Sequence, residues 1–320
     1  MKNKLFLIFR IIVTFAIILA LFKFIPYSKI VEIYKYSYKP YIFLSLGISL
    51  ACYLLGVSRW KLLLNHLNVN VSNKEIFSCY FSSLFFNLFF PSFIAGDVFR
   101  GATISYRYGD TKKVVSSIFM DRFSGGTTLT LMALFATILS LVLGYNTWVG
   151  KEVIISVFVL CSIVGAIAVV IFNDSFFLFL VKLFEKNKFL KEKLISVHEQ
   201  CGFFRDNPYI FFKSLVYSAL INILGICAVF IASRAFGVEI SILYFFVLFP
   251  LVVVVSSIPI TIAGIGTRDA AAVYFFTLAG IDKSIGLGLS LLSLISIVLV
   301  GIMGGVIYVS IYHRRLQSSS

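Results

Sequence analysis

Two stretches of the sequence decide the fold, and the first is IFSCYFSSLFFNLFFPSFIAGDVFR at residues 76–100. The second, LYFFVLFPLVVVVSSIPITIAGIGTRD, occupies residues 243–269. Each begins as an apolar run that carries serines, reaches a proline, and has a glycine five residues later, followed by an acid and an arginine. Broken, polar backbone is tolerated at membrane depth only inside protein or beside water. Each stretch is therefore predicted to form a re-entrant hairpin that enters and leaves a membrane on one side.

The composition around these stretches is that of a membrane protein. Of the 320 residues, 60% are apolar and only 13% are charged, whereas a soluble domain is roughly 45–50% apolar. A soluble globule of this composition could not cover its own surface, so we predict an all-α polytopic membrane protein. This excludes a cytosolic enzyme, a secreted disulfide scaffold and a nucleic-acid binder. The net charge of +14 is typical of positive loops that face the cytoplasm and its anionic lipids.

Eight apolar blocks divide the chain. They occupy residues 5–25, 41–57, 76–95, 117–144, 153–172, 210–233, 243–262 and 285–311. With 76–95 and 243–262 as hairpins, six blocks remain as full spans, the first of them uncleaved because its apolar run is too long for a signal peptide. The chain is then one transmembrane domain, residues 1–311, with a short cytoplasmic tail at 312–320.

The distribution of basic residues gives the orientation. In the six-span arrangement the segments 1–10, 58–122, 173–209 and 312–320 lie on one side and hold 19 of the Lys and Arg residues, against 7 on the other side. Positive loops stay in the cytoplasm, so both termini are predicted to be cytoplasmic, in the cell membrane. Three spans and a hairpin in each half (1–144 and 153–311) make an inverted repeat, in which the hairpins enter from opposite faces and meet near the midplane.

The hairpins carry the predicted site. Proline breaks a helix and glycine permits a sharp turn or a close ligand, so the predicted hairpin-forming residues are Pro91, Gly96, Pro259, Gly264 and Gly266. The helix that restarts has free N–H groups and a positive dipole end, which Asp97 could cap and a phosphate could bind.

Arg100 and Arg268 are the predicted phosphate donors, each with an acidic neighbour, Asp97 and Asp269. Charges are costly inside a bilayer, which favours a functional use. The alternative is that each acid–arginine pair is only a neutral support of its hairpin. Arg122, which follows Asp121 at the start of the fourth block, either joins the headgroup site or anchors the chain at the inner interface.

Three further features have alternatives of their own. Residues 174–201 form a basic amphipathic segment that either lies on the inner leaflet or merely connects two spans. Gly301 and Gly305 form a GxxxG pair that packs inside the chain or forms the face of a homodimer. Arg59-Trp60-Lys61 is interpreted as an aromatic-basic anchor at the interface.

At these motifs the chain resembles the lysylphosphatidylglycerol synthase transmembrane region, the flippase-like domain of multiple peptide resistance factors. The matching stretches are Pro91–Arg100, Val115–Arg122 and Pro259–Asp269, and the block order is similar over most of residues 1–311. Asp269 stands where the family usually has glutamate, which keeps the charge. The resemblance implies movement of an aminoacylated phospholipid, or of another lipid-linked phosphate such as a polyprenyl lipid, between leaflets, with a role in resistance to antimicrobial peptides.

The full-length synthases carry a soluble aminoacyl-transferase domain after the membrane part. This sequence ends nine residues after the last block, at Ser320, so we expect no lysyl transfer from this chain alone.

Two other functions stay open. A non-catalytic subunit could hold a separate soluble or membrane synthase or a glycosyltransferase. A membrane-embedded transferase for lipid phosphates would need a general base, a nucleophile or an acidic metal site. The sequence has three scattered histidines and neither an HExxH nor a CxxC motif, so we expect no catalytic residue, no metal and no cofactor.

Overall fold

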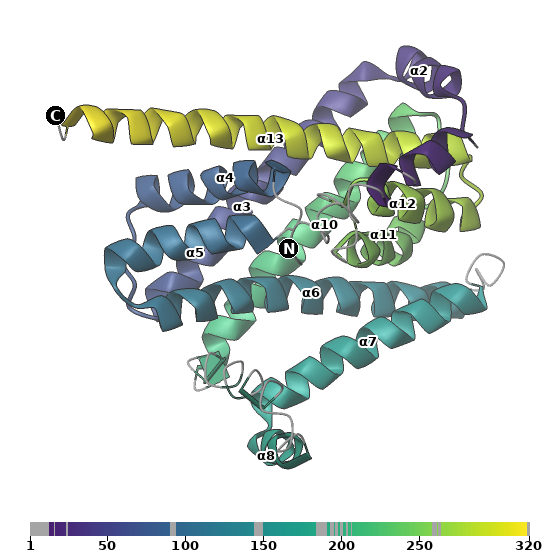
Figure 1. The fold of residues 1–320 in the computed structure, drawn as a ribbon. Helices are drawn as coiled ribbons and strands as arrows, with labels where there is room; N and C mark the ends of the chain where they lie inside the picture. Colours follow the sequence, from purple (N-terminus) through teal and green to yellow (C-terminus); the bar gives the residue numbers. More distant parts are fainter. Residues whose placement is uncertain are drawn as a thin grey trace.

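The structure is a computed structural model that describes residues 13–15, 17–23, 25–89, 94–143, 150–183, 191–192, 195, 198, 201–202, 204–205, 207–257, 261 and 264–318. These residues form helices, with no strand in the described part (Figure 1). The helices are α2 (Tyr27–Tyr36), α3 (Lys39–His66), α4 (Asn73–Phe89), α5 (Ile94–Tyr108), α6 (Thr111–Val142), α7 (Lys151–Phe172), α8 (Asp174–Leu183), α10 (Pro208–Ala235), α11 (Ile242–Ser257), α12 (Thr267–Leu278) and α13 (Lys283–Ser318).

Five of these helices, α3, α6, α7, α10 and α13, are long and apolar enough to cross a membrane. A further span arises if the helical segment Val13–Lys23 and α2 are taken together, although the two are bent by 74°. Pro26, the residue just before α2, lies in the break between these two helices, where the sequence predicts the first span to end. The prediction of a polytopic all-α membrane protein is confirmed.

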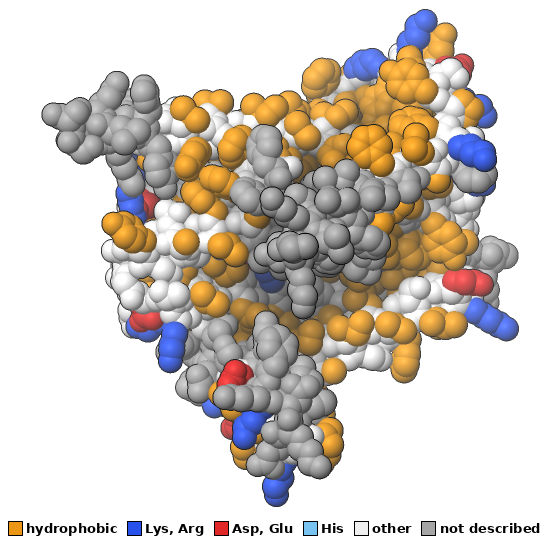
Figure 2. Space-filling model, viewed as in Figure 1, with side chains coloured by type: hydrophobic (Ala, Val, Ile, Leu, Met, Phe, Trp, Pro, Cys, Tyr) orange, Lys and Arg blue, Asp and Glu red, His pale blue; other side chains and the backbone are white. Residues whose placement is uncertain are grey.

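The outer surface has the apolar character that lipid requires. Phe158 and Ile155 of α7 are 70% and 61% exposed, which would be unfavourable in water but suits a hydrocarbon environment. Figure 2 shows hydrophobic side chains over much of the visible face, with Lys and Arg toward its edges. The described surface therefore fits a protein embedded in a bilayer.

Helices α4 and α5 form a hairpin. The backbone N–H of Gly96 donates to Asn87 Oδ1 at 2.8 Å near the closed end, and the Tyr108 hydroxyl donates to Glu75 at 2.7 Å near the open end. A Cβ on Gly96 would lie 2.3 Å from the Ser83 carbonyl oxygen, so glycine is required for this close approach. Pro91 lies outside the described residues. The hairpin is longer than the predicted block 76–95, because its second arm, α5, has too polar a sequence to register as an apolar run.

The second hairpin consists of α11 and α12. Its arms pack together, with the rings of Phe245 and Phe276 5.6 Å apart. Gly264 and Gly266 have φ of +70° and +90° in the turn, a conformation that favours glycine. Pro259 lies outside the described residues. In Figure 1 the two hairpins connect to the rest of the chain at opposite ends of the molecule.

Long-range contacts join the two ends of the chain. Helix α3 packs along α10, while α13 packs on α4 and α6 packs on α11. The glycines of α13 face α4: a Cβ on Gly301 would lie 2.3 Å from Leu88, and one on Gly305 would lie 2.6 Å from Phe85. The GxxxG pair thus packs inside the chain. Helix α8 is the longest described part of the predicted amphipathic segment 174–201, of which 184–190, 193–194, 196–197 and 199–200 lie outside the described residues.

Candidate functional site

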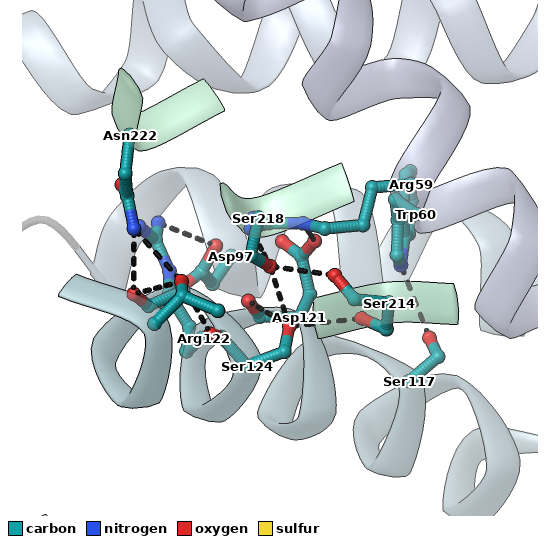
Figure 3. A network of polar contacts seen from close by, with 12 residues as sticks. Arg59, Trp60, Asp97, Ser117, Asp121, Arg122, Ser124, Ser214, Ser218 and Asn222 are labelled. Atoms are coloured by element: carbon teal, nitrogen blue, oxygen red, sulfur yellow. Dashed lines mark hydrogen bonds and ion pairs between the residues drawn. The ribbon is translucent and has the colours of Figure 1, made fainter. Parts of the chain in front are cut away.

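A buried carboxylate on α6 joins three helices. Asp121 accepts a hydrogen bond from Arg59 Nε of α3 at 2.7 Å (Figure 3). It accepts another from Arg100 Nη2 of α5 at 2.9 Å. All three residues are at most 8% exposed. Two arginines on one carboxylate leave a positive charge in excess at this point, which a second carboxylate partly balances.

That second carboxylate is Asp97, in the first turn of α5. Arg122 of α6 holds it with two bonds, from Nε at 2.9 Å and from Nη2 at 3.0 Å, and Arg100 Nε donates at 3.1 Å. The predicted pair of Asp97 and Arg100 therefore exists, but Arg122 is the closer partner. Among the described residues the Asp97 carboxylate accepts from arginines and not from backbone, so the expected helix cap is not seen.

Arg100 is more deeply buried than the Asp97–Arg122 pair and is 2% exposed. Its guanidinium carbon is 4.6 Å from the Trp60 ring centroid and 5.5 Å from that of Tyr80, so the rings stabilise the cation. Its Nη1 is buried and has no hydrogen-bond partner in the described part of the chain.

Arg59 and Trp60 lie in the protein interior, which contradicts the predicted interfacial anchor. Trp60 is fully buried and donates its indole N–H to Ser117 at 3.0 Å, and Arg59 Nη1 donates to Ser218 of α10 at 2.8 Å. Only Lys61 fits the anchor, because its ammonium reaches Asn73 near the surface. Arg59 and Asp121 were not predicted as members of a binding network. The available signal was that both are charges close to apolar blocks.

The second half has a smaller network. Arg268 of α12 donates from Nε to Ser290 of α13 at 3.0 Å and from Nη2 to Asp269 at 3.2 Å. Ser290 in turn donates to Asp269 at 2.6 Å, and the backbone N–H of Gly266 donates to the other oxygen of Asp269 at 2.8 Å. Asp269 therefore caps the start of α12 while it orients Arg268, so both predicted residues lie together.

One cavity brings the two networks together. It has a volume of about 560 Å³, and Arg122, Asp97 and Arg268 lie in its wall. The remaining wall is largely apolar and comes from α3, α10, α11, α12 and α13, with several serines. A second cavity of about 220 Å³ is lined by Arg59, Arg100 and Asp121, and by Asp97 and Arg122 from the first. The cavity that Arg268 reaches is thus shared with Arg122, whereas Arg100 lies behind it.

The arrangement suits an anion with an apolar tail. Guanidinium groups present forked donors to phosphate, and an apolar wall accommodates acyl chains. Among the described residues no three His, Cys, Asp or Glu side chains are grouped as a metal site would require.

The fold and the cavity define a multi-pass membrane protein with charged residues at its centre. The family model of the lysylphosphatidylglycerol synthase TM region matches residues 7–305, and the chain belongs to this family. Its function is therefore related to membrane lipid. No curated protein and no solved structure matches the chain significantly.

Proposed function

We propose that this protein moves a phospholipid, or another lipid-linked phosphate, between the leaflets of the cell membrane. Arg122 and Arg268 bind the phosphate in the cavity of about 560 Å³, and the apolar wall receives part of the acyl chains. The observation that carries this function is the presence of one arginine from each half of the chain in the wall of the same cavity.

The surroundings of these arginines support binding of a ligand. Asp97 engages Nε and Nη2 of Arg122, yet the Arg122 side chain remains 56% exposed. Asp269 and Ser290 likewise hold Arg268 by Nε and Nη2. Each guanidinium is therefore fixed in orientation and keeps a donor for a ligand, which reduces the ordering entropy that binding would cost.

The hairpins support movement across the membrane. We place the two halves, 1–144 and 153–311, as an inverted repeat with both termini in the cytoplasm. A site between hairpins that enter from opposite faces can be opened to either side by rocking one half against the other. Residues Gly96, Gly264 and Gly266 permit the tight backbone that such hairpins need.

The test replaces the two arginines by lysine, which keeps the charge but loses the forked donors. Losing one charge-assisted hydrogen bond, worth about 1.5–3 kcal/mol, lowers transport by about tenfold or more. The assay measures how much anionic phospholipid a membrane-impermeant phospholipase reaches on the outer face of cells that express Arg122→Lys or Arg268→Lys.

Arg107→Lys is the matched control, because Arg107 of α5 pairs with Glu75 of α4 and does not line the cavity. It should leave lipid exposure unchanged at equal expression. Normal exposure in both cavity variants would reject phosphate binding by these arginines.

A further inference from the structure

We propose that the lipid that fits this cavity is an anionic phospholipid with an uncharged, hydroxyl-rich headgroup, and that a cationic aminoacyl headgroup is disfavoured. The inference rests on the proposed lipid-binding function and names the substrate class of the same cavity. Three observations carry it: the charge balance of the two networks, the occupation of every carboxylate, and the serines of the wall.

The charge balance leaves one positive charge unmatched. Four arginines form the two networks, Arg59, Arg100, Arg122 and Arg268, against the three aspartates Asp97, Asp121 and Asp269. The described residues that line the two cavities include no other Lys, Arg, Asp or Glu. An unmatched charge away from water is costly. The buried Nη1 of Arg100, which has no hydrogen-bond partner among the described residues, belongs to this excess.

One phosphodiester carries the single negative charge that would balance the site. A headgroup made only of the phosphate and hydroxyl groups adds no further charge. A lysyl ester adds two ammonium groups to the same phosphate, so its binding would raise the excess from one charge to two. At the reduced dielectric of a protein interior this difference is large.

Each carboxylate of the two networks already pairs with an arginine. Both oxygens of Asp97 accept from arginines, and each oxygen of Asp121 accepts from one arginine. Asp269 accepts from Gly266 on one oxygen and from Arg268 and Ser290 on the other. An ammonium group at any of these carboxylates would lie close to the arginine that the carboxylate already holds, and the two positive charges would repel each other.

The serines of the wall suit hydroxyls. Ser49, Ser257 and Ser293 line the cavity, and each donates its proton to the carbonyl four residues earlier, at 2.9, 2.8 and 3.0 Å. Their oxygens keep lone pairs that can accept hydrogen bonds. A glycerol or sugar headgroup supplies neutral hydroxyl donors to such acceptors without adding charge.

A competition assay tests the substrate class. The protein in lipid nanodiscs binds phosphatidylglycerol labelled on an acyl chain, and unlabelled phosphatidylglycerol, phosphatidylinositol, phosphatidylethanolamine or lysyl-phosphatidylglycerol displaces it. We expect the first two lipids to compete at least about tenfold better than lysyl-phosphatidylglycerol. Comparison of the first two distinguishes a glycerol from a cyclic polyol headgroup.

A designed charge reverses the preference. Phosphatidylethanolamine has no net charge and leaves the excess positive charge of the wild-type site unbalanced, so we expect it to compete less well than phosphatidylglycerol. Ser296→Asp adds a carboxylate to the wall of the larger cavity and cancels the excess charge, so this advantage of phosphatidylglycerol should disappear. Ser296→Asn, the neutral variant of the same size, should keep the wild-type order of lipids. If Ser296→Asp fails to insert in the membrane, the wild-type competition alone decides.

The outcomes separate this inference from the function on which it rests. Lysyl-phosphatidylglycerol that competes as well as phosphatidylglycerol would overturn the substrate class while transport stands. An unchanged lipid order in Ser296→Asp would also overturn it. Equal and weak competition by all four lipids, together with normal lipid exposure in Arg122→Lys and Arg268→Lys, would overturn the transport function itself.

Discussion

Replacement of Asp121 by asparagine should lower the free energy of unfolding by about 3–5 kcal/mol, the usual cost of leaving one partner of a buried ion pair uncompensated. Asparagine keeps the size of the side chain but removes the charge that faces Arg59 Nε at 2.7 Å and Arg100 Nη2 at 2.9 Å. Arg100 retains Asp97 as a partner. Arg59 retains only the neutral Ser218 among its described partners, so most of the cost comes from Arg59.

This origin of the cost predicts a rescue. Arg59→Met removes the orphaned charge and keeps an apolar side chain that fills part of the space. The double variant Arg59→Met, Asp121→Asn should therefore lose less free energy of unfolding than the two single variants lose together. The difference, the coupling energy, should be about 2 kcal/mol.

The assay titrates the protein in mixed micelles with dodecyl sulfate and follows unfolding with a thiol-reactive dye, which reaches the buried Cys79 and Cys201 only when the chain opens. Asp110→Asn is the control. Its carboxylate pairs with Lys113 at 2.9 Å but is 39% exposed, so the change should be below about 1 kcal/mol. Wild-type stability of Asp121→Asn, or strict additivity in the double variant, would refute the reasoning.

Three further outcomes are expected. Gly304→Ala should destabilise the protein strongly, because its Cβ would lie 2.0 Å from a backbone oxygen of α4. The control, Gly165→Ala, has no atom within 4 Å of the new Cβ and should be neutral or stabilising, and unfolding titrations compare the two variants. Cysteines at Asn73 and Thr111, where α4 and α6 begin, should react with an impermeant thiol reagent from the same side of the membrane, and labelling from opposite sides would contradict the hairpin. The Ser284 N–H holds the pKa of Asp282 below its ordinary value. The Asp282 carboxylate therefore stabilises the fold above the ordinary aspartate pKa, and this stabilisation is lost as the pH falls through the lowered pKa. In thermal unfolding, Asp282→Ala should be less stable than wild type at neutral pH and should converge with it in acid.

The sequence by itself determined the class of protein and the places where its backbone breaks. The length of the apolar runs, the basic segments between them and the two proline–glycine breaks follow from local composition, because lipid excludes charge and unpaired backbone over a fixed thickness. The same reasoning singled out Asp97, Arg100 and Arg268 beside the breaks, and it offered Arg122 as a headgroup ligand or an interface anchor at the start of the fourth apolar block. Arg100 lines the smaller cavity, while the other three share the larger one.

Only the tertiary structure decided which charges meet. Arg59 and Asp121 are 62 positions apart, and their contact depends on the rotation and depth at which α3 packs near α6. An interfacial anchor and a buried ion-pair partner have the same local sequence, so Arg59-Trp60 could not be told from an anchor. Helix α5 was not predicted as part of the hairpin for a related reason. Its polar side chains have hydrogen-bonding partners on other helices, so the segment does not need an apolar sequence and does not form an apolar run.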